Sequence, residues 1–108
     1  MKRVIKFRAW GPNCQMMWNW EQVKNIASRL GWENFNEGER VLMQFTGLED
    51  KNGVEIYEGD IVSLDDRETF VSFEWLGCGY YFKDGIPLSD YSNIEVIGNI
   101  YEHKELLG

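Results

Sequence analysis

The sequence predicts a mainly β fold of the β-rich α+β class, a small antiparallel barrel or sandwich of short strands with one α-helix near residues 19–30. Two observations lead to this prediction. From residue 41 onward, short runs of β-branched and aromatic residues alternate with turn residues. A convincing helical period of apolar residues occurs only between residues 19 and 30. Such frequent reversals build meanders, sandwiches or small barrels rather than parallel sheets with crossover helices.

The chain has the size of one ordinary domain. Its 108 residues are 44% hydrophobic and 15% aromatic, which is far above the composition of disordered chains. We therefore expect a single domain over residues 1–108, with a core that needs no disulfide or metal to hold it.

The first predicted strand is RVIKFRAW, which alternates with the two-residue period of a half-buried strand. Its two faces are Ile5, Phe7 and Ala9 on one side, and Val4, Lys6, Arg8 and Trp10 on the other. Gly11-Pro12-Asn13 then indicates a turn.

The predicted helix has one apolar stripe with the spacing i, i+3, i+4 and i+7. The stripe consists of Val23, Ile26, Ala27 and Leu30. Asn19 and Gln22 have the spacing of a capping box, with Asn in place of the usual Ser or Thr. Gly31 suits the left-handed conformation that commonly follows a helix.

The polar stretch at residues 33–40 indicates a loop, and a series of strands follows it. The predicted strands are VLMQF at 41–45, VEIY at 54–57, IVSL at 61–64, TFVSFEW at 69–75, GYYF at 79–82 and IEVIGNIY at 94–101. Asn52-Gly53 is a hairpin signal, because both residues tolerate the positive φ of a type I′ turn. Val71, Phe73 and Trp75 share one face of their strand.

The stretch DKNG resembles the middle of a calcium-binding EF-hand loop. If Gly53 takes loop position 6, Asp50 and Asn52 fill positions 3 and 5, but Leu48 and Gly59 stand at the two ends. The carboxylate that closes the calcium cage is therefore missing. The same residues explain a hairpin, with Asp50 capping the turn.

No other pattern predicts a cofactor, metal or catalytic site. Gly77 and Gly79 flank Cys78 but lead into a strand, which favours a hairpin turn over a phosphate-binding loop. Cys14, Cys78 and His103 lack the close pairs of a structural zinc site. His103 lies in the charged segment YEHKELLG, where we expect a solvated surface side chain.

Paired carboxylates are the remaining candidates for acid and base chemistry. They are Asp65-Asp66 and Glu58 with Asp60, but acid-rich turns are common in a chain with 18 Asp and Glu. We expect no enzymatic activity.

Charge is distributed unevenly along the chain, whose net charge is −7. The first ten residues contain four basic side chains and no acid, which leaves 7 Lys and Arg against 18 Asp and Glu in the other 98 residues, a balance of −11. Such a surface repels phosphate, so nucleic-acid binding by the body of the protein is disfavoured. The basic strand is the exception, unless Lys6 and Arg8 are neutralised by acidic neighbours of this chain or of another subunit.

Aromatic residues supply a second group of candidates for partner binding. Trp75, Tyr80 and Tyr81 lie close in sequence across one predicted hairpin, where an exposed pair could stack on bases or hold a peptide. Most such rings fill the core of a small β fold. One of Tyr80 and Tyr81 must point outward if the strand is regular.

Several features predict a cytoplasmic protein without membrane contact. The start MKRVIKFRAW lacks the apolar stretch and cleavage site of a secretory signal. No apolar run approaches the roughly 20 residues that a membrane helix needs. Cys14 and Cys78 are expected to be reduced thiols.

Three blocks of the chain resemble the YopX family of small proteins encoded by phages and prophages. They are KFRAW at 6–10, LMQFTGLEDKNGVEIYEGDIV at 42–62 and IEVIGNIYEHKELL at 94–107. The resemblance implies a mainly β fold with some helix and a phage origin, and it implies no catalytic or ligand-binding residues. The helix at 19–30 and the segment 65–93 match no pattern of the family.

Three functions remain open at this point, besides an enzyme, which would need a concave pocket lined by polar groups near His103 or a cysteine. We expect a non-enzymatic binding or regulatory module of phage origin that contacts a protein and forms a homo-oligomer. The candidate partner-binding residues are Lys6, Arg8, Trp75, Tyr80 and Tyr81. The second function is nucleic-acid contact, which requires Lys2, Arg3, Lys6 and Arg8 to be exposed and unpaired. The third is a decoy that imitates DNA. It needs one exposed face made of Glu49, Asp50, Glu58, Asp60, Asp65 and Asp66.

Overall fold

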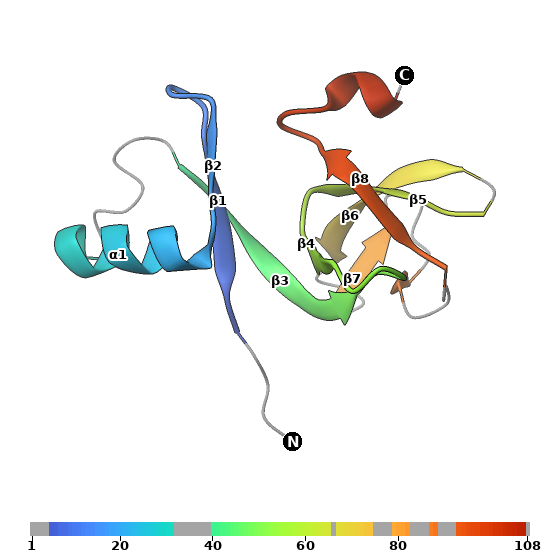
Figure 1. The fold of residues 1–108 in the computed structure, drawn as a ribbon, viewed down its shortest axis with the longest axis horizontal. Coiled ribbons are helices and arrows are strands. Elements are labelled where there is room, and N and C mark those ends of the chain that lie inside the picture. The colour runs from blue at the N-terminus through green and yellow to red at the C-terminus, as the bar shows by residue number, and fades with distance from the viewer. Residues whose placement is uncertain are drawn as a thin grey trace. The chain divides into compact units, whose positions relative to one another are not determined.

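The structure, a computed structural model, describes residues 5–31, 40–65, 67–74, 79–82, 87–88 and 93–107. Within these residues the elements are, in order, β1 Phe7–Gly11, β2 Met16–Trp18, α1 Trp20–Leu30, β3 Val41–Glu49, β4 Glu55–Tyr57, β5 Asp60–Ser63, β6 Glu68–Glu74, β7 Gly79–Phe82, β8 Glu95–Asn99 and the 3-10 helix η3 Lys104–Leu107 (Figure 1). In the described part of the chain, the strands form two antiparallel sheets, one of them a curled half-barrel, accompanied by one α-helix, α1. The mainly β prediction is confirmed.

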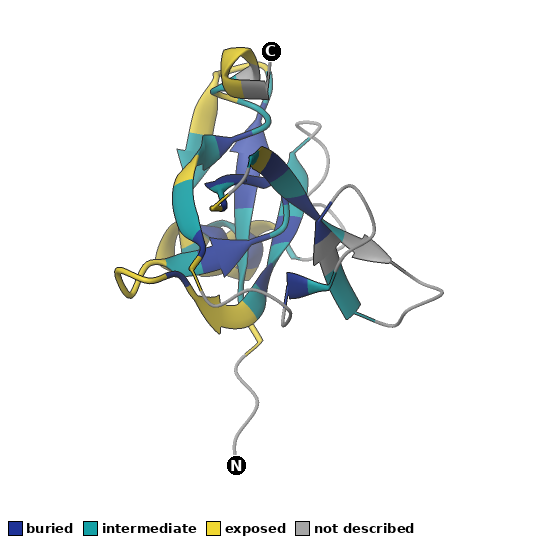
Figure 2. Ribbon diagram, turned by 90° about the vertical axis from the view of Figure 1, so that its right-hand side faces the viewer, coloured by how far each residue is buried: buried dark blue, intermediate teal, exposed yellow. Residues whose placement is uncertain are grey.

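The two sheets have the strand orders β2-β1-β3-β4 and β7-β6-β5-β8. The chain forms two compact units, of which the first ends at Phe45 and the second begins at Thr46. Each unit has its own cluster of buried apolar side chains. Turn residues 51–54 and the described side chains of η3 are exposed, whereas buried residues lie mainly in strands (Figure 2).

The core of the first unit lies between α1 and the strands beside it. Ala9 of β1 pairs with Trp18 of β2 and with Leu42 of β3, so it is flanked on both sides. The helix contributes Val23 and Ala27, which are buried with Ala9 in one cluster. Figure 1 shows α1 beside the β1–β2 hairpin. Val23, Ile26 and Ala27 of the predicted stripe therefore pack with Ala9, whereas Leu30 of the stripe and Ile5 of the predicted strand face are exposed.

Both ends of α1 follow the sequence signals. The Asn19 side chain accepts the Gln22 amide proton at 3.0 Å, and the Gln22 side chain accepts the Asn19 amide proton at 2.9 Å. This reciprocal pair is a complete capping box. At the other end, Gly31 has φ +80° and donates its amide proton to the Ala27 carbonyl at 2.8 Å. The prediction for residues 19–30 is confirmed.

The strand β2 was not predicted, because three residues are too few to show a period. It forms by pairing with β1 through a turn at Pro12–Gln15. Gln15 has φ +56° and donates its amide proton to the Gly11 carbonyl at 2.7 Å. A Cβ atom at Gly11 would lie 2.5 Å from the Trp18 ring. Glycine at this position therefore lets the indole pack directly on the neighbouring backbone.

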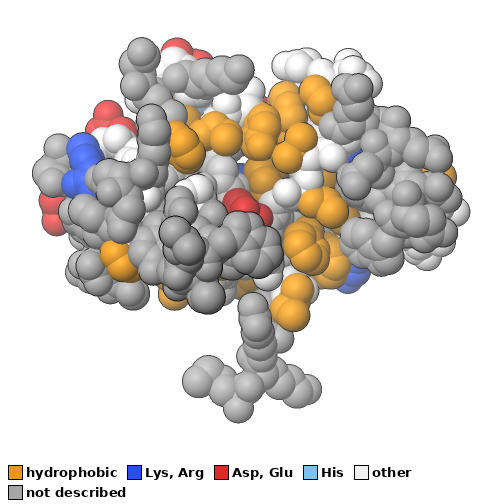
Figure 3. All heavy atoms as spheres, turned by 180° about the vertical axis from the view of Figure 1, so that it is seen from behind, with side chains coloured by type: hydrophobic (Ala, Val, Ile, Leu, Met, Phe, Trp, Pro, Cys, Tyr) orange, Lys and Arg blue, Asp and Glu red, His pale blue; other side chains and the backbone are white. Residues whose placement is uncertain are grey.

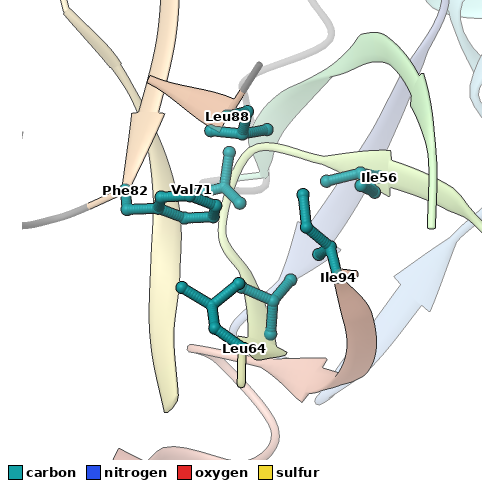
Figure 4. Close-up of a cluster of buried hydrophobic side chains, with 7 residues drawn as sticks. Ile56, Leu64, Val71, Phe82, Leu88 and Ile94 are labelled. Atoms are coloured by element: carbon teal, nitrogen blue, oxygen red, sulfur yellow. The ribbon is translucent and has the colours of Figure 1, made fainter. Parts of the chain in front are cut away.

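The core of the second unit is a cluster of aliphatic and aromatic side chains from β4 to β8. Its buried members are Ile56, Val62, Leu64, Val71, Phe82, Leu88 and Ile94. Figure 4 shows the side chains of Phe82, Val71 and Leu64 turned toward those of Ile94 and Ile56. Val71 pairs with Phe82 across β6 and β7, which places two of these side chains on one face.

The turn at Asn52-Gly53 exists, but it is not the predicted type I′ turn. Gly53 has φ +81°, whereas Asn52 has no positive φ. The Gly53 amide donates to the Asp50 carbonyl at 3.0 Å, which closes a β-turn ahead of the left-handed glycine. Asp50 explains the difference, because its side chain accepts the Asn52 amide proton at 2.8 Å and selects this conformation.

Candidate functional site

The basic side chains of the first strand are not fully exposed. Lys6 is half-buried, and its Nζ lies 4.9 Å from the centroid of the Phe45 ring. Arg8 is also half-buried and has an interaction partner. Nucleic-acid contact required both to be exposed and unpaired, so these two residues do not meet that requirement. Lys2 and Arg3 lie outside the described residues.

The three aromatic candidates do not form a described surface. Tyr80 is half-buried and packs against the core cluster of the second unit. Tyr81 lies opposite Ser72 in the strand pairing, and its side chain lies outside what the structure describes. Trp75 also lies outside the described residues. Only Tyr80 can therefore be placed, and its ring contributes to the core.

A cavity of about 360 Å³ lies at the C-terminal end of α1. The described residues that line it are Ile26, Arg29, Leu30 and Arg40. The first three occupy positions i, i+3 and i+4 of the helix, so they share one side of it. Arg40, the residue directly before β3, lines the same cavity. The helix and the start of β3 together thus place two guanidinium groups and two aliphatic side chains around one hollow.

Two of the described lining residues, Ile26 and Arg40, are positioned by contacts with the rest of the first unit. Ile26 is half-buried and packs against the core cluster of the first unit, which anchors the wall of the cavity. The Cζ atom of Arg40 lies 5.4 Å from the centroid of the Trp18 ring, in cation–π geometry. Leu30 has 41% of its surface exposed. The site therefore combines fixed side chains with an accessible apolar one.

Sequence reasoning missed this site. The spacing of Ile26, Arg29 and Leu30 was available as a signal, because it places a cation within an apolar helical stripe. No sequence signal indicated that Arg40 lines the same cavity, because its place there depends on how β3 packs beside the helix.

Asp50 is buried, and its carboxylate binds backbone amides. Oδ1 accepts the amide protons of Asn52 at 2.8 Å and Val54 at 2.9 Å, and Oδ2 accepts that of Val96 at 2.9 Å. Burial acts to raise the pKa of Asp50, but these hydrogen bonds and the charge of Lys51 outweigh it, so the pKa lies below its ordinary value of 3.8. The group that suggested a calcium loop is thus occupied in holding a turn to β8.

Asp60, the first residue of β5, serves a similar local purpose. It is 1% exposed, and Oδ2 accepts the Tyr57 amide proton at 2.8 Å. Two of the six carboxylates named for a DNA-like surface, Asp50 and Asp60, are therefore buried. Asp66 lies outside the described residues. On the face drawn in Figure 3, the Asp and Glu side chains lie in small separate groups.

The prediction of a solvated His103 is wrong. Its ring is half-buried, and Nδ1 accepts the Asn99 amide proton at 3.1 Å. A Cβ atom at Gly98 would lie 2.7 Å from this Nδ1, so the glycine permits the close approach of the ring. Accepting the hydrogen bond requires that Nδ1 carry no proton. His103 thus stabilises the chain reversal after β8.

Neither cysteine contributes to a described site of metal-binding side chains. Cys14 is exposed in the β1–β2 turn, and Cys78 lies outside the described residues. The described part of the chain contains no group of three or more His, Cys, Asp or Glu side chains arranged to hold a metal ion. Within that same part, no helix has both the length and the apolar character needed to cross a membrane.

Comparison with known proteins identifies the fold and the family. The crystal structure of protein EF1440 from Enterococcus faecalis is similar, with a TM-score of 0.66 and 24% sequence identity over 99% of this chain and 100% of that one. This likeness concerns the fold. No curated protein matches the chain. The profile of the YopX protein family matches residues 6–108, a span that includes the α1 cavity and the Asp50 turn. The chain therefore belongs to the YopX family.

Proposed function

We propose that this chain is a non-enzymatic binding or regulatory module, encoded by a phage or prophage, that acts on a protein in the bacterial cytoplasm. The observation that supports the proposal is the cavity lined by Ile26, Arg29, Leu30 and Arg40. Arginine is enriched in protein–protein interfaces, whose buried centres are more apolar than the rest of the surface. The phage origin rests on membership of the YopX family.

The energetics favour a small, partly apolar contact. Leu30 exposes 41% of its surface beside a half-buried Ile26, so a partner side chain that covers Leu30 removes apolar surface from water. Arg40 is held against Trp18 and loses little freedom on binding. Self-association is one form that such a contact can take, with a second copy as the partner.

Nucleic-acid contact has less support. The net charge of −7 repels phosphate, and Lys6 and Arg8 are half-buried. The DNA-mimic alternative loses Asp50 and Asp60 from its exposed face because both are buried.

Affinity capture from a lysate of the bacterial host tests the proposal. Three tagged proteins are compared, with and without nuclease treatment: wild type, Leu30→Asp and the control Asn25→Asp. Both substitutions add one negative charge to an exposed position of α1, but only Leu30 lines the cavity. Circular dichroism establishes that both variants fold, and sedimentation of each purified protein reports self-association.

We expect wild type and Asn25→Asp to retain a partner protein after nuclease treatment, and Leu30→Asp to lose it. Loss of self-association in Leu30→Asp alone would equally support it. Retention that disappears with nuclease, or that is the same for all three proteins, would overturn the assignment to this cavity.

A further inference from the structure

We propose that the α1 cavity binds a carboxylate next to an aliphatic side chain, presented by an acidic segment of a partner protein. This inference rests on the proposed function and specifies the chemistry of the same site. Its basis is the exposed guanidinium of Arg29, which lies beside the aliphatic side chains of Ile26 and Leu30 in the described lining of the cavity.

Arg29 is the accessible cation of the site. It is exposed and makes no hydrogen bond or ion pair with any residue that the structure describes. Its neighbour on the helix, Lys24, is by contrast paired with Glu21 at 3.0 Å. A guanidinium presents its donors in a planar fork that matches the two oxygens of a carboxylate. Arg29 can therefore accept a carboxylate without first breaking a described ion pair.

Arg40 supplies a second positive charge whose position is more restricted. Its guanidinium lies against the Trp18 ring, so the cation–π contact limits the directions in which its remaining donors point. The backbone at the C-terminal end of α1 opposes anion binding, because a helix carries roughly −0.5 charge there. The full positive charge of Arg29 exceeds that partial charge. Arg29 therefore favours a negative group beside it, although the chain as a whole is acidic.

The walls of the cavity restrict the ligand further. Ile26 and Leu30 offer apolar surface, which a sugar–phosphate backbone cannot cover favourably but an aliphatic side chain can. The volume of about 360 Å³ lies at the low end of the range of about 300–1,000 Å³ seen in ligand sites. A carboxylate with one neighbouring aliphatic side chain suits this space. The net charge of −7 repels a polyanion far more than a segment with one or two acids.

Selection from a random heptapeptide display library, with the full chain as bait, tests this chemistry. The enriched peptides are synthesised with a fluorophore, and their dissociation constants are measured by polarisation in 0.15 M salt. The proteins compared are wild type, Arg29→Gln, Arg29→Lys and the control Lys24→Gln. Lys24→Gln removes the same charge from the same helix at a residue outside the described lining. A second series replaces the acidic residue of each peptide by its amide.

We expect the enriched peptides to contain Asp or Glu next to Leu, Ile or Val. Arg29→Gln should weaken their binding about tenfold or more, Arg29→Lys less, and Lys24→Gln little. The amide peptide should bind wild type weakly and lose nothing further with Arg29→Gln, since the two changes remove one interaction.

Failure of this inference and failure of the proposed function give different results. Enriched peptides that lack acids, yet lose affinity for Leu30→Asp, would keep the binding cavity and overturn the acidic ligand. Peptides whose affinity changes with neither Arg29→Gln nor Leu30→Asp would overturn both. A selection that enriches no peptide above background would overturn the inference.

Discussion

The carboxylate of Asp50 and the backbone amide of Val96 lie 46 positions apart in the chain and are joined by a hydrogen bond of 2.9 Å. The same carboxylate caps the Asn52–Val54 turn through its other oxygen. Beside it, the Lys51 amide donates to the Ile94 carbonyl at 2.9 Å. One turn of the β3–β4 hairpin is thereby attached to the start of β8. The Asp50 side chain thus couples the local turn to this long-range contact.

Stability should fall in acid because of Asp50. Its pKa in the folded chain lies below the ordinary value of 3.8, so the stabilisation is complete above that value and is lost as the pH falls through the lower, folded value. Urea unfolding of wild type and Asp50→Asn at pH 7 and pH 3 measures the stabilisation that the Asp50 carboxylate contributes. The variant should be less stable at pH 7 by about 1–3 kcal/mol, the usual cost of lost hydrogen bonds to a charged group.

The difference between the two proteins should shrink at pH 3, where wild type begins to protonate the carboxylate. Glu49→Gln is the control, because Glu49 is exposed next to Asp50 in sequence. Equal acid sensitivity of wild type and Asp50→Asn would contradict this account.

Gly11→Ala should destabilise the β1–β2 hairpin. The added Cβ would lie 2.5 Å from the Trp18 ring and 2.9 Å from the Cys14 Sγ, so the indole must move. Overpacking of this kind costs about 1–3 kcal/mol. Met16→Ala changes the residue paired with Gly11, and since Met16 is 49% exposed it should cost much less. The urea midpoints of Gly11→Ala and Met16→Ala measure this difference. A Gly11→Ala protein as stable as wild type would refute the close packing of the Trp18 ring on Gly11.

Asn99→Ala should loosen the reversal after β8. The Asn99 side chain accepts the amide protons of Tyr101 at 3.0 Å and Glu102 at 2.9 Å, and its Nδ2 donates to Glu102 Oε1 at 2.8 Å. Because Asn99 is buried, its loss leaves the amides of Tyr101 and Glu102 without their acceptor, which costs about 1–3 kcal/mol of stability.

Amide hydrogen exchange of Tyr101 and Glu102 measures that local effect. Glu102→Gln keeps the acceptor for Nδ2 and should leave both amides protected. Unchanged exchange of the two amides in Asn99→Ala would show that Asn99 does not hold the turn.

Asn19→Ala should shorten or weaken α1. It removes the acceptor for the Gln22 amide, and N-cap substitutions of this kind cost about 0.5–2 kcal/mol. The exposed mid-helix residue Asn25 provides the control, since Asn25→Ala raises helix propensity and should not destabilise. Unfolding followed by circular dichroism distinguishes the two. Equal stability of both variants would mean that the capping box contributes little.

The two ends of α1 were predictable, because residues within four positions of each other form them. The helix, its capping box and the glycine at its end follow from local hydrogen bonds, so Asn19, Gln22 and Gly31 identified them. The turn at Asn52-Gly53 was located correctly, but its type was wrong because the Asp50 side chain selects another conformation.

The candidate site was predictable only in part. Lys6, Arg8, Trp75, Tyr80 and Tyr81 were chosen from charge and aromatic content, which do not report burial. Tyr80 packs on the core, and Lys6 lies against Phe45. Arg29 and Leu30 were visible as neighbours on the helix, but nothing in the local sequence indicates that Arg40 closes the same cavity.

The sequence by itself determined the fold class, the helix α1 with both its ends, most of the described strands and the family, because periodicity and turn chemistry act over a few residues. Tertiary structure alone decided that Asp50 meets Val96, that His103 is half-buried beneath Gly98, and that Arg29 and Arg40 share a cavity. Each of these pairings joins separate turns or elements of the chain. Such contacts depend on how the strands and the helix pack. The energy of packing depends on several segments together and cannot be inferred from any one of them.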